Sequence, residues 1–466
     1  MLRRKATSSG ESTVSNGGPQ RGSIFTGLLL ILIGSLFLLQ RFDPDLGIGH
    51  LLARYWPVIL IVWGAAKLID HFAAGKSGED RPPLLNGTEA ALLALLVVVL
   101  VGMAVLEWLP RIHPSWAAKT DIFQSRVEQT QSLPSVQIPV GSRVRVAIDN
   151  GNITLRAVEG SEMRLSADVQ AAGSSDTAAN SRLGGVQLAV DHSSGEFVVH
   201  VNGKNASDAS VHANLSLDLP SATPVSAQTQ NGDIQISGFT SGVTAQTGGG
   251  DLDIHDCNGD IVATAAGGDT HISNIQGNVT LNGRGNDVDI NDISGNATLA
   301  GSFLGTVVVR NVAGNTQYAE TRTNLVVAKL SGRIEADADD LKITGAAGPA
   351  RVSTRDKDVE IDDVSGPLDV ANTHGDVTVR FDNPPSQSVN IANGTGDVTL
   401  SLPAGSNFRI SAVAGSGEVD SDFDADSLQL VNGDSSGKLS GSVGSGGPGI
   451  SITTSYGTIR LRRSSS

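Results

Sequence analysis

The sequence predicts an all-β protein, a parallel β-solenoid (β-helix) with coils of about 18 residues, preceded by an α-helical transmembrane region. Three observations lead to this fold class. A Gly-Asp motif returns at a regular interval, aliphatic residues alternate with polar ones after it, and long apolar segments are confined to the first quarter of the chain. The 466 residues include 55 Gly and only 4% aromatic residues, and all four Trp precede residue 120. The chain therefore has two unlike parts.

The repeat is clearest from "NGDIQISG" onward. Each copy has an Asp, two aliphatic residues at alternate positions, an apolar residue at the sixth position after the Asp, and then a Gly. Successive members of the aspartate column are separated by a nearly constant interval. The column comprises Asp233, Asp251, Asp269, Asp287, Thr306, Asn324, Asp340, Asp358 and Asp376. A fixed period of this kind indicates stacked repeat units.

Each copy holds two short strands with one apolar face, as in Ile234/Ile236 and Val279/Leu281. A single coil cannot bury that face alone, so we expect the coils to stack and to hydrogen-bond to the coils on either side. We assign residues 231–463 to this repeat solenoid and residues 140–230 to its irregular, β-rich start. The Gly- and Ser-rich stretches at 171–186 and 432–449 predict loops. The segment "TSYGTIRLRR" is expected to close the array.

The first part of the chain predicts a membrane anchor within residues 24–110. Apolar segments at about 24–40, 51–69 and 90–109 have the length and composition of transmembrane helices. Basic residues before the first segment and after the second favour a cytoplasmic N-terminus, with residues 1–23 as a disordered tail. Three crossings then place the solenoid on the extracytoplasmic side of a bacterial cytoplasmic membrane, after a linker at 111–139. A re-entrant second segment would reverse this orientation.

Charge and cysteine content exclude some functions. Residues 1–119 hold 11 Lys and Arg against 8 Asp and Glu, whereas the remaining residues hold 22 against 40. Such an acidic region repels nucleic acid, so we expect no nucleic-acid partner. The single cysteine, Cys257, rules out an intrachain disulfide. It shares a column with Ile275 and Ile293, which predicts a buried packing residue and no nucleophile.

The repeated aspartates are the first candidates for chemistry. Stacked in register, their carboxylates would lie about 5 Å apart, the spacing between strands. One interpretation is a ladder of Ca²⁺ sites formed by Asp233, Asp251, Asp269, Asp287, Asp358 and Asp376. The favoured interpretation is structural, with each carboxylate accepting backbone N–H bonds at its turn. Thr306 and Asn324 in the same column support the structural role, because both can cap a turn and neither is a strong calcium ligand.

Other chemical groups are scattered. His255, His271 and His374 fall near coil turns but share no column, and the nine His show no metal-ligand spacing. The pair Asp362 and Asp363 is reminiscent of paired carboxylates in polysaccharide hydrolases, but short coils leave no loops to build a catalytic groove. We therefore predict no catalytic residue, no metal site and no cofactor.

Two stretches resemble known families. "GLLLILIGSLFLL" followed by "YWPVILIVWGAAKLI" resembles the membrane-spanning region of bacterial cell-wall-stress regulators of the Lia type, over roughly residues 22–70. "LDLPSATPVSAQTQNGDIQISG", the Gly-Asp coils and "ISITTSYGTIRLRR" resemble the bacterial putative-adhesin family of β-solenoid domains, over about residues 140–463. This second resemblance implies a membrane-tethered extracytoplasmic scaffold without known catalytic residues.

Together these patterns predict a non-enzymatic membrane protein whose solenoid contacts envelope proteins or a cell-wall polymer. It would act as an adhesin-like surface or as the sensing arm of an envelope-stress system. A polysaccharide-acting β-helix enzyme is the alternative from another class. A self-assembling cytoplasmic scaffold is a further alternative if the topology is reversed.

Overall fold

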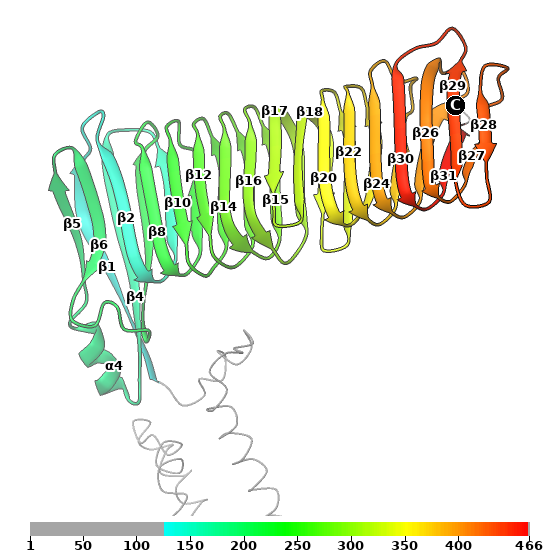
Figure 1. Ribbon diagram of the computed structural model, residues 1–466. Helices are drawn as coiled ribbons and strands as arrows, with labels where there is room; N and C mark the ends of the chain where they lie inside the picture. Colours follow the sequence, from blue (N-terminus) through cyan, green and yellow to red (C-terminus); the bar gives the residue numbers. More distant parts are fainter. Residues whose placement is uncertain (1–124, 465–466) are drawn as a thin grey trace, which may run out of the picture. The chain divides into compact units, whose positions relative to one another are not determined.

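A computed structural model describes residues 125–464, and Figure 1 shows their strands side by side in one long stack. The all-β class is confirmed, since the described residues contain 31 strands, β1–β31, and one helix, α4 (Asp176–Leu183). Val127–Ala171 and Asn180–Ser466 belong to one compact unit. Outside the described residues lie the predicted tail at 1–23, the segments at 24–40, 51–69 and 90–109, and residues 111–124 of the linker predicted at 111–139. Between residues 125 and 464, no helix is long and apolar enough to cross a membrane.

Most strands belong to two ladders, in which nearly all strands pair in parallel with the strands of the adjacent coils. Val243, for example, lies opposite Val225 on one side and Ile261 on the other, so each partner is one repeat away in the sequence. The first ladder contains β3 (Ile153–Val158), β7 (Val211–Pro220), β9 (Ile234–Ser237), β11 (Leu252–Cys257), β13 (Thr270–Ile275), β15 (Val288–Ile293), β19 (Asp340–Ala346), β21 (Asp358–Val364), β23 (Val377–Arg380), β25 (Val398–Pro403), β27 (Val419–Ser421) and β31 (Ile459–Ser464). The second ladder contains β2 (Arg143–Asn150), β6 (Glu196–Asn202), β8 (Val225–Asn231), β10 (Val243–Thr247), β12 (Ile261–Ala265), β14 (Val279–Gly285), β16 (Ala297–Phe303), β20 (Ala350–Asp356), β22 (Leu368–His374), β24 (Val389–Thr395), β26 (Phe408–Ser416), β28 (Gln429–Asn432), β29 (Gly437–Val443) and β30 (Gly449–Tyr456).

The core lies between the two ladders. Within one coil, β11 buries Leu252 and Ile254 while β12 buries Ile261 and Ala263, each at most 1% exposed. Alternate residues of the same strands face solvent, as the period of a strand requires. Aliphatic side chains from successive coils therefore form continuous rows along the interior.

In most coils of the first ladder, a residue with left-handed backbone conformation turns the chain at the corner. Asp256, for example, has φ 57° and immediately precedes the fully buried Cys257. Asn and Asp tolerate this conformation better than other non-glycine residues. The corner residues with positive φ in successive coils are Gly238, Asp256, Asn274, Asp292, Asn311, Lys329, Gly345 and Asp363. The left-handed residue makes a local bulge that directs the next side chain into the core. This explains why an apolar residue follows each repeat Asp at a fixed offset.

The parallel order is interrupted once, at β17 (Val307–Ala319) and β18 (Thr323–Ala336). These strands run through both ladders and pair antiparallel, with Val307 opposite Ala336 and Tyr318 opposite Leu325. β18 is also antiparallel to β19 and β20, so one coil runs backwards before the forward direction resumes. The placement of Asn324 in the aspartate column is therefore wrong, because Asn324 pairs with Ser353 in the second ladder.

Both ends of the stack contain an inserted coil. β2 and β3 lie between the strands β6 and β7 on one side and β8 and β9 on the other. At the opposite end, β30 lies between β24 and β26, and β31 lies between β25 and β27. The expectation that the final basic segment closes the array is therefore wrong, since β26 to β29 lie beyond it.

The two predicted loops contain regular structure. Residues 171–186 include the end of β4 (Glu162–Gly173) and helix α4. Residues 432–449 include β29, which pairs antiparallel with β26 and β28. The remaining described strands are β1 (Ser125–Gln137) and β5 (Gln187–Ser193), which pair with β4 and β6. The Gly and Ser content of the two stretches predicted the turns but concealed the short elements between them.

A buried lysine holds the turn at which the chain resumes its forward direction. The backbone N–H groups of Asp339 and Asp340 donate to Oδ1 of Asp337, at 3.0 and 2.8 Å. Lys357 is 5% exposed, and its Nζ donates to the carbonyl oxygens of Asp337 and Ala338. These bonds satisfy carbonyl groups that the β18–β19 turn leaves without a strand partner.

We expect Lys357→Met to destabilise the protein by about 1–3 kcal/mol, because the carbonyl groups of Asp337 and Ala338 lose their donor. Lys204→Met, at an exposed position, should leave stability nearly unchanged. Denaturant unfolding of both variants measures the difference. Equal stabilities would contradict the role of Lys357 at this turn.

Candidate functional site

The aspartates of the repeat bind the backbone of the adjacent coil. The N–H of Asp251 donates to Oδ1 of Asp233 at 2.9 Å, and the N–H of Asp269 donates to Oδ1 of Asp251 at 2.8 Å. The same bond joins Asp269 to Asp287, Asp287 to Thr306, Asp358 to Asp376, Asp376 to Asp397, and Asp397 to Thr458. Each carboxylate thus caps the next coil, whereas the sequence suggested a cap on its own turn.

A second polar column does the same work and was missed in the sequence. Asp260, Asn278, Asn296 and Asn315 each follow a column glycine. The N–H of Asn278 donates to Oδ1 of Asp260 at 2.8 Å, and the N–H groups of Asn296 and Asn315 donate to the preceding Asn at 2.9 Å. The signal was present as "NGD", "QGN", "SGN" and "AGN" at matching positions. Both columns use their side-chain oxygens to stack coils.

Two acidic residues that bind cations, Asp397 and Glu360, have lowered pKa values. The N–H of Thr458 and the guanidinium of Arg460, 2.6 Å from the Asp397 carboxylate, hold the pKa of Asp397 below its usual value. Bonds from Lys342 and Arg380 likewise lower the pKa of Glu360. These groups are charged at neutral pH, as charge-compensated residues on the outer surface are expected to be.

Asp362 and Asp363, the pair considered for catalysis, lie in different environments. Asp362 lies 3.4 Å from Nη1 of Arg380 and 4.0 Å from Nζ of Lys342. Asp363 occupies a left-handed corner with φ 55°. Within residues 125–464, no group of three or more His, Cys, Asp or Glu side chains is arranged to hold a metal ion.

The cysteine and the histidines have different environments. Cys257 is fully buried, as its column predicted, and burial raises the pKa of its thiol. His255 and His374 each contact a carboxylate, Asp256 at 2.9 Å and Asp356 at 3.0 Å. The bond from Asn274, followed by that from His255, lowers the pKa of Asp256.

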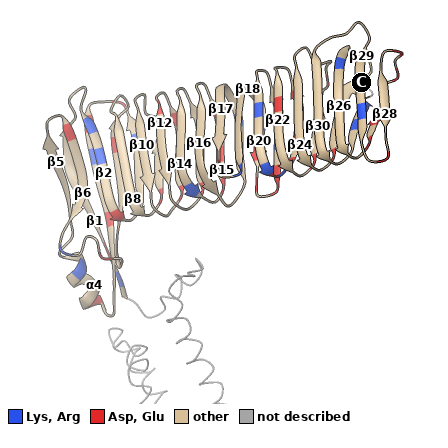
Figure 2. Ribbon diagram, viewed as in Figure 1, with Lys and Arg blue, Asp and Glu red and all other residues tan. Residues whose placement is uncertain are grey.

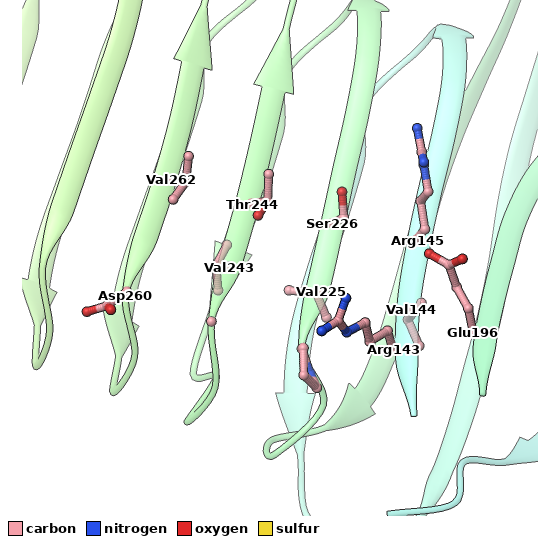
Figure 3. Close-up of a pocket in the computed structure, with 12 residues that line it drawn as sticks. Arg143, Val144, Arg145, Glu196, Val225, Ser226, Val243, Thr244, Asp260 and Val262 are labelled. Carbon is pink, nitrogen blue, oxygen red and sulfur yellow. The ribbon is translucent and has the colours of Figure 1, made fainter. Parts of the chain in front are cut away.

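A shallow groove crosses the outer face of the second ladder near its N-terminal coils (Figure 3). Its volume is about 500 Å³. Arg143 and Arg145 of β2 lie at one end, with Glu196 of β6 beside them, and Asp260 lies near the other. The Nη2 atom of Arg145 donates to Oε1 of Gln228 at 3.5 Å, a long bond that leaves most of the guanidinium available. No sequence pattern indicated this groove, because strands far apart in the chain form it.

The groove opens onto a face with few charges. Across the strands, Arg145 is followed in register by Ser226, Thr244, Val262, Thr280 and Thr298. Strands β10, β12 and β16 contain no charged residue, and β14 contains only Arg284 near its end. Figure 2 shows these strands almost entirely free of charge. Hydroxyl and amide groups, with the exposed Val262 among them, therefore line a path from the two arginines along the stack.

These features define an all-β domain built from repeated coils, with carboxylates that bind neighbouring backbone. The chain belongs to the Toastrack DUF4097 family, which matches residues 143–357 and 331–462. Residues 24–68 match the LiaI-LiaF-like transmembrane region, which associates the chain with a membrane. Both resemblances noted in the sequence are thereby confirmed.

Similar solved structures include three bacterial proteins. A putative cell adhesion protein from Clostridium sporogenes is 10% identical, with 73% of this chain and 100% of that chain covered and a TM-score of 0.16. A putative adhesin from Bacteroides fragilis is 12% identical, with 72% and 97% covered and a TM-score of 0.19. A putative lipid binding protein from Parabacteroides distasonis is 12% identical, with 72% and 96% covered and a TM-score of 0.17. No curated protein matches the chain.

We expect Asp251→Ala to destabilise the protein by about 1–2 kcal/mol, because the N–H of Asp269 loses its acceptor. Asp251→Asn retains an acceptor oxygen and should lower the stability clearly less, as measured by denaturant unfolding.

Millimolar Ca²⁺ should leave the melting temperature of the unaltered protein unchanged. A calcium-dependent rise in melting temperature that both variants reduce would instead support the calcium interpretation.

Proposed function

We propose that this protein is a non-enzymatic, membrane-anchored interaction module that presents a parallel β-solenoid on the extracytoplasmic side of a bacterial cytoplasmic membrane. Residues 1–23 would form the cytoplasmic tail, 24–110 the transmembrane region and 111–139 the linker. Residues 140–230 and 231–463 would form the irregular start and the repeat of the solenoid. The match of residues 24–68 to a transmembrane region supports the anchor.

The observation that best supports a contact function is the structural use of the repeat carboxylates. In the aspartate column the Oδ1 atoms of Asp233, Asp251 and Asp269 accept N–H bonds from the next coil. Catalytic carboxylates need free oxygens directed at a substrate in a cleft. Here the carboxylate oxygens hold adjacent coils together and so maintain an extended surface, which favours a binding function over catalysis.

We propose that the groove and the uncharged face beyond it contact a cell-wall polymer. Arg143 and Arg145 can donate to anionic groups, and the Ser, Thr and Asn side chains can hydrogen-bond a hydrated chain. A polymer lying along this face meets few carboxylates, although the domain as a whole is acidic. Adhesion and stress sensing both require such a contact surface.

The orientation can be tested with a single new cysteine. We expect Ser445→Cys, at an exposed position, to react in intact spheroplasts with a thiol reagent that cannot cross membranes. The unaltered protein is the control, since its buried Cys257 should react slowly. Labelling only after lysis would overturn the extracytoplasmic placement and favour the alternative of a cytoplasmic scaffold.

The contact surface can be tested with paired charge variants. Arg143→Gln combined with Arg145→Gln should lower retention of the full-length protein on isolated cell wall at least threefold. Arg351→Gln is the matched control, because Arg351 is exposed on the same ladder but already pairs with Asp369. Equal losses in both proteins would argue against the groove. Turnover of glycans by the unaltered protein would favour the alternative of a polysaccharide-acting enzyme.

A further inference from the structure

The end of the stack farthest from β1 carries an open sheet edge (Figure 1). β28 (Gln429–Asn432) pairs antiparallel with β29, and no other strand within residues 125–464 pairs with it. All four of its residues are exposed, including Leu430 at 48% and Val431 at 65%. An exposed edge strand offers unpaired N–H and C=O groups to another chain.

The hairpin geometry shows which groups are available. The N–H of Gly433 donates to the carbonyl oxygen of Ser436, and this bond closes the β28–β29 hairpin. In an antiparallel pair, residues alternate between those that exchange bonds with the partner strand and those whose groups point away. Counting from Gly433, Val431 faces β29, and the N–H and C=O of Leu430 point to the open side.

The other edge strands are protected from pairing, in contrast to β28. At the same end of the stack, Nδ2 of Asn432 donates to the carbonyl oxygen of Val419 at 3.0 Å, and Oδ1 of Asn432 accepts the Val419 N–H at 3.1 Å. This side chain covers the last strand of the first ladder. At the opposite end, β1 contains Pro134 and Glu128, residues that discourage edge pairing. The other edge strand at that end, β5, contains Asp191, and Oε1 of Gln131 accepts its Leu188 N–H at 3.0 Å. The sequence of β28, Gln-Leu-Val-Asn, contains no such residue.

The charges around β28 indicate the kind of partner. Asp424, Asp426 and Asp434 flank the strand. Among residues 125–464 they have no cation partner of the kind that Asp420 and Asp422 have in Arg462. Lys438 is the only cation of the β28–β29 hairpin. A second copy of β28 would bring two such acidic clusters together, and like charges across paired strands are destabilising. A basic partner would neutralise them.

We propose that β28 is a docking edge for an extended, basic peptide segment of a partner protein, which adds a strand to the second ladder. Main-chain bonds to Leu430 supply the pairing, and the exposed Leu430 and Val431 side chains contact alternate side chains of the partner. Flanking lysines or arginines of the partner face Asp424, Asp426 and Asp434. This inference concerns the tip of the stack and is independent of the groove.

The test uses the full-length protein in detergent and a fluorescent octapeptide with a Val-Thr-Val-Thr centre and two lysines at each end. A peptide with glutamates in place of the lysines is the matched control. We expect saturable binding of the basic peptide, measured by anisotropy, at least tenfold tighter than that of the acidic peptide. Binding should weaken with added salt, since flanking charges contribute to it.

Two kinds of variant distinguish backbone pairing from charge. Leu430→Pro removes the outward N–H and should weaken binding at least tenfold, whereas Leu430→Ala keeps the N–H and should weaken it far less. Asp426→Asn combined with Asp434→Asn leaves the strand intact and should weaken binding severalfold while flattening its salt dependence.

Three outcomes would overturn the proposal. Equal affinity of Leu430→Pro and Leu430→Ala would show that strand addition does not occur. Equal binding of the acidic peptide would remove the charge argument. A concentration-dependent dimer seen by light scattering, lost in Leu430→Pro and undisturbed by the basic peptide, would make a second copy the occupant.

Discussion

Hydrogen bonds between coils are the constraint on which the structure depends. A coil has no helix or hairpin to satisfy its own backbone, so its N–H and C=O groups find partners only in the coils on either side. The side-chain columns that begin at Asp233 and Asp260 extend the same bonding to the corners, where strand pairing stops. Because every coil needs its neighbours, the length of the coil is fixed, and the regular repeat follows.

This constraint explains why much of the fold could be predicted from the sequence. Pairs such as Ile234 and Ile236 carry the period of a strand, and recurrence at a fixed step places them in one stack. The burial of Cys257 follows from its column. The reversal at β18 was harder to find, because alternating apolar and polar residues have the same pattern in either chain direction. Its signal was the interval between Asn324 and Asp340, which is shorter than the others in the column.

Other features depend on long-range pairings that local patterns do not encode. β3 pairs with β9 although β4 to β8 lie between them in the chain, and β25 pairs with β31 across β26 to β30. The groove combines Arg145, Thr244 and Val262 from separate coils, so its geometry requires the register between strands. The contact surface could therefore not be predicted from the sequence, whereas the structural role of the repeat aspartates could.

The inserted coil of β30 and β31 has a mechanical consequence. A terminal coil at the end of a stack could be peeled away by breaking bonds on one side only. Here a pull on residues 449–464 must extract strands that are bonded on both faces, to β24 and β25 and to β26 and β27. These bonds are loaded together in shear. The coil of β30 and β31 should therefore resist mechanical unfolding of this end of the stack.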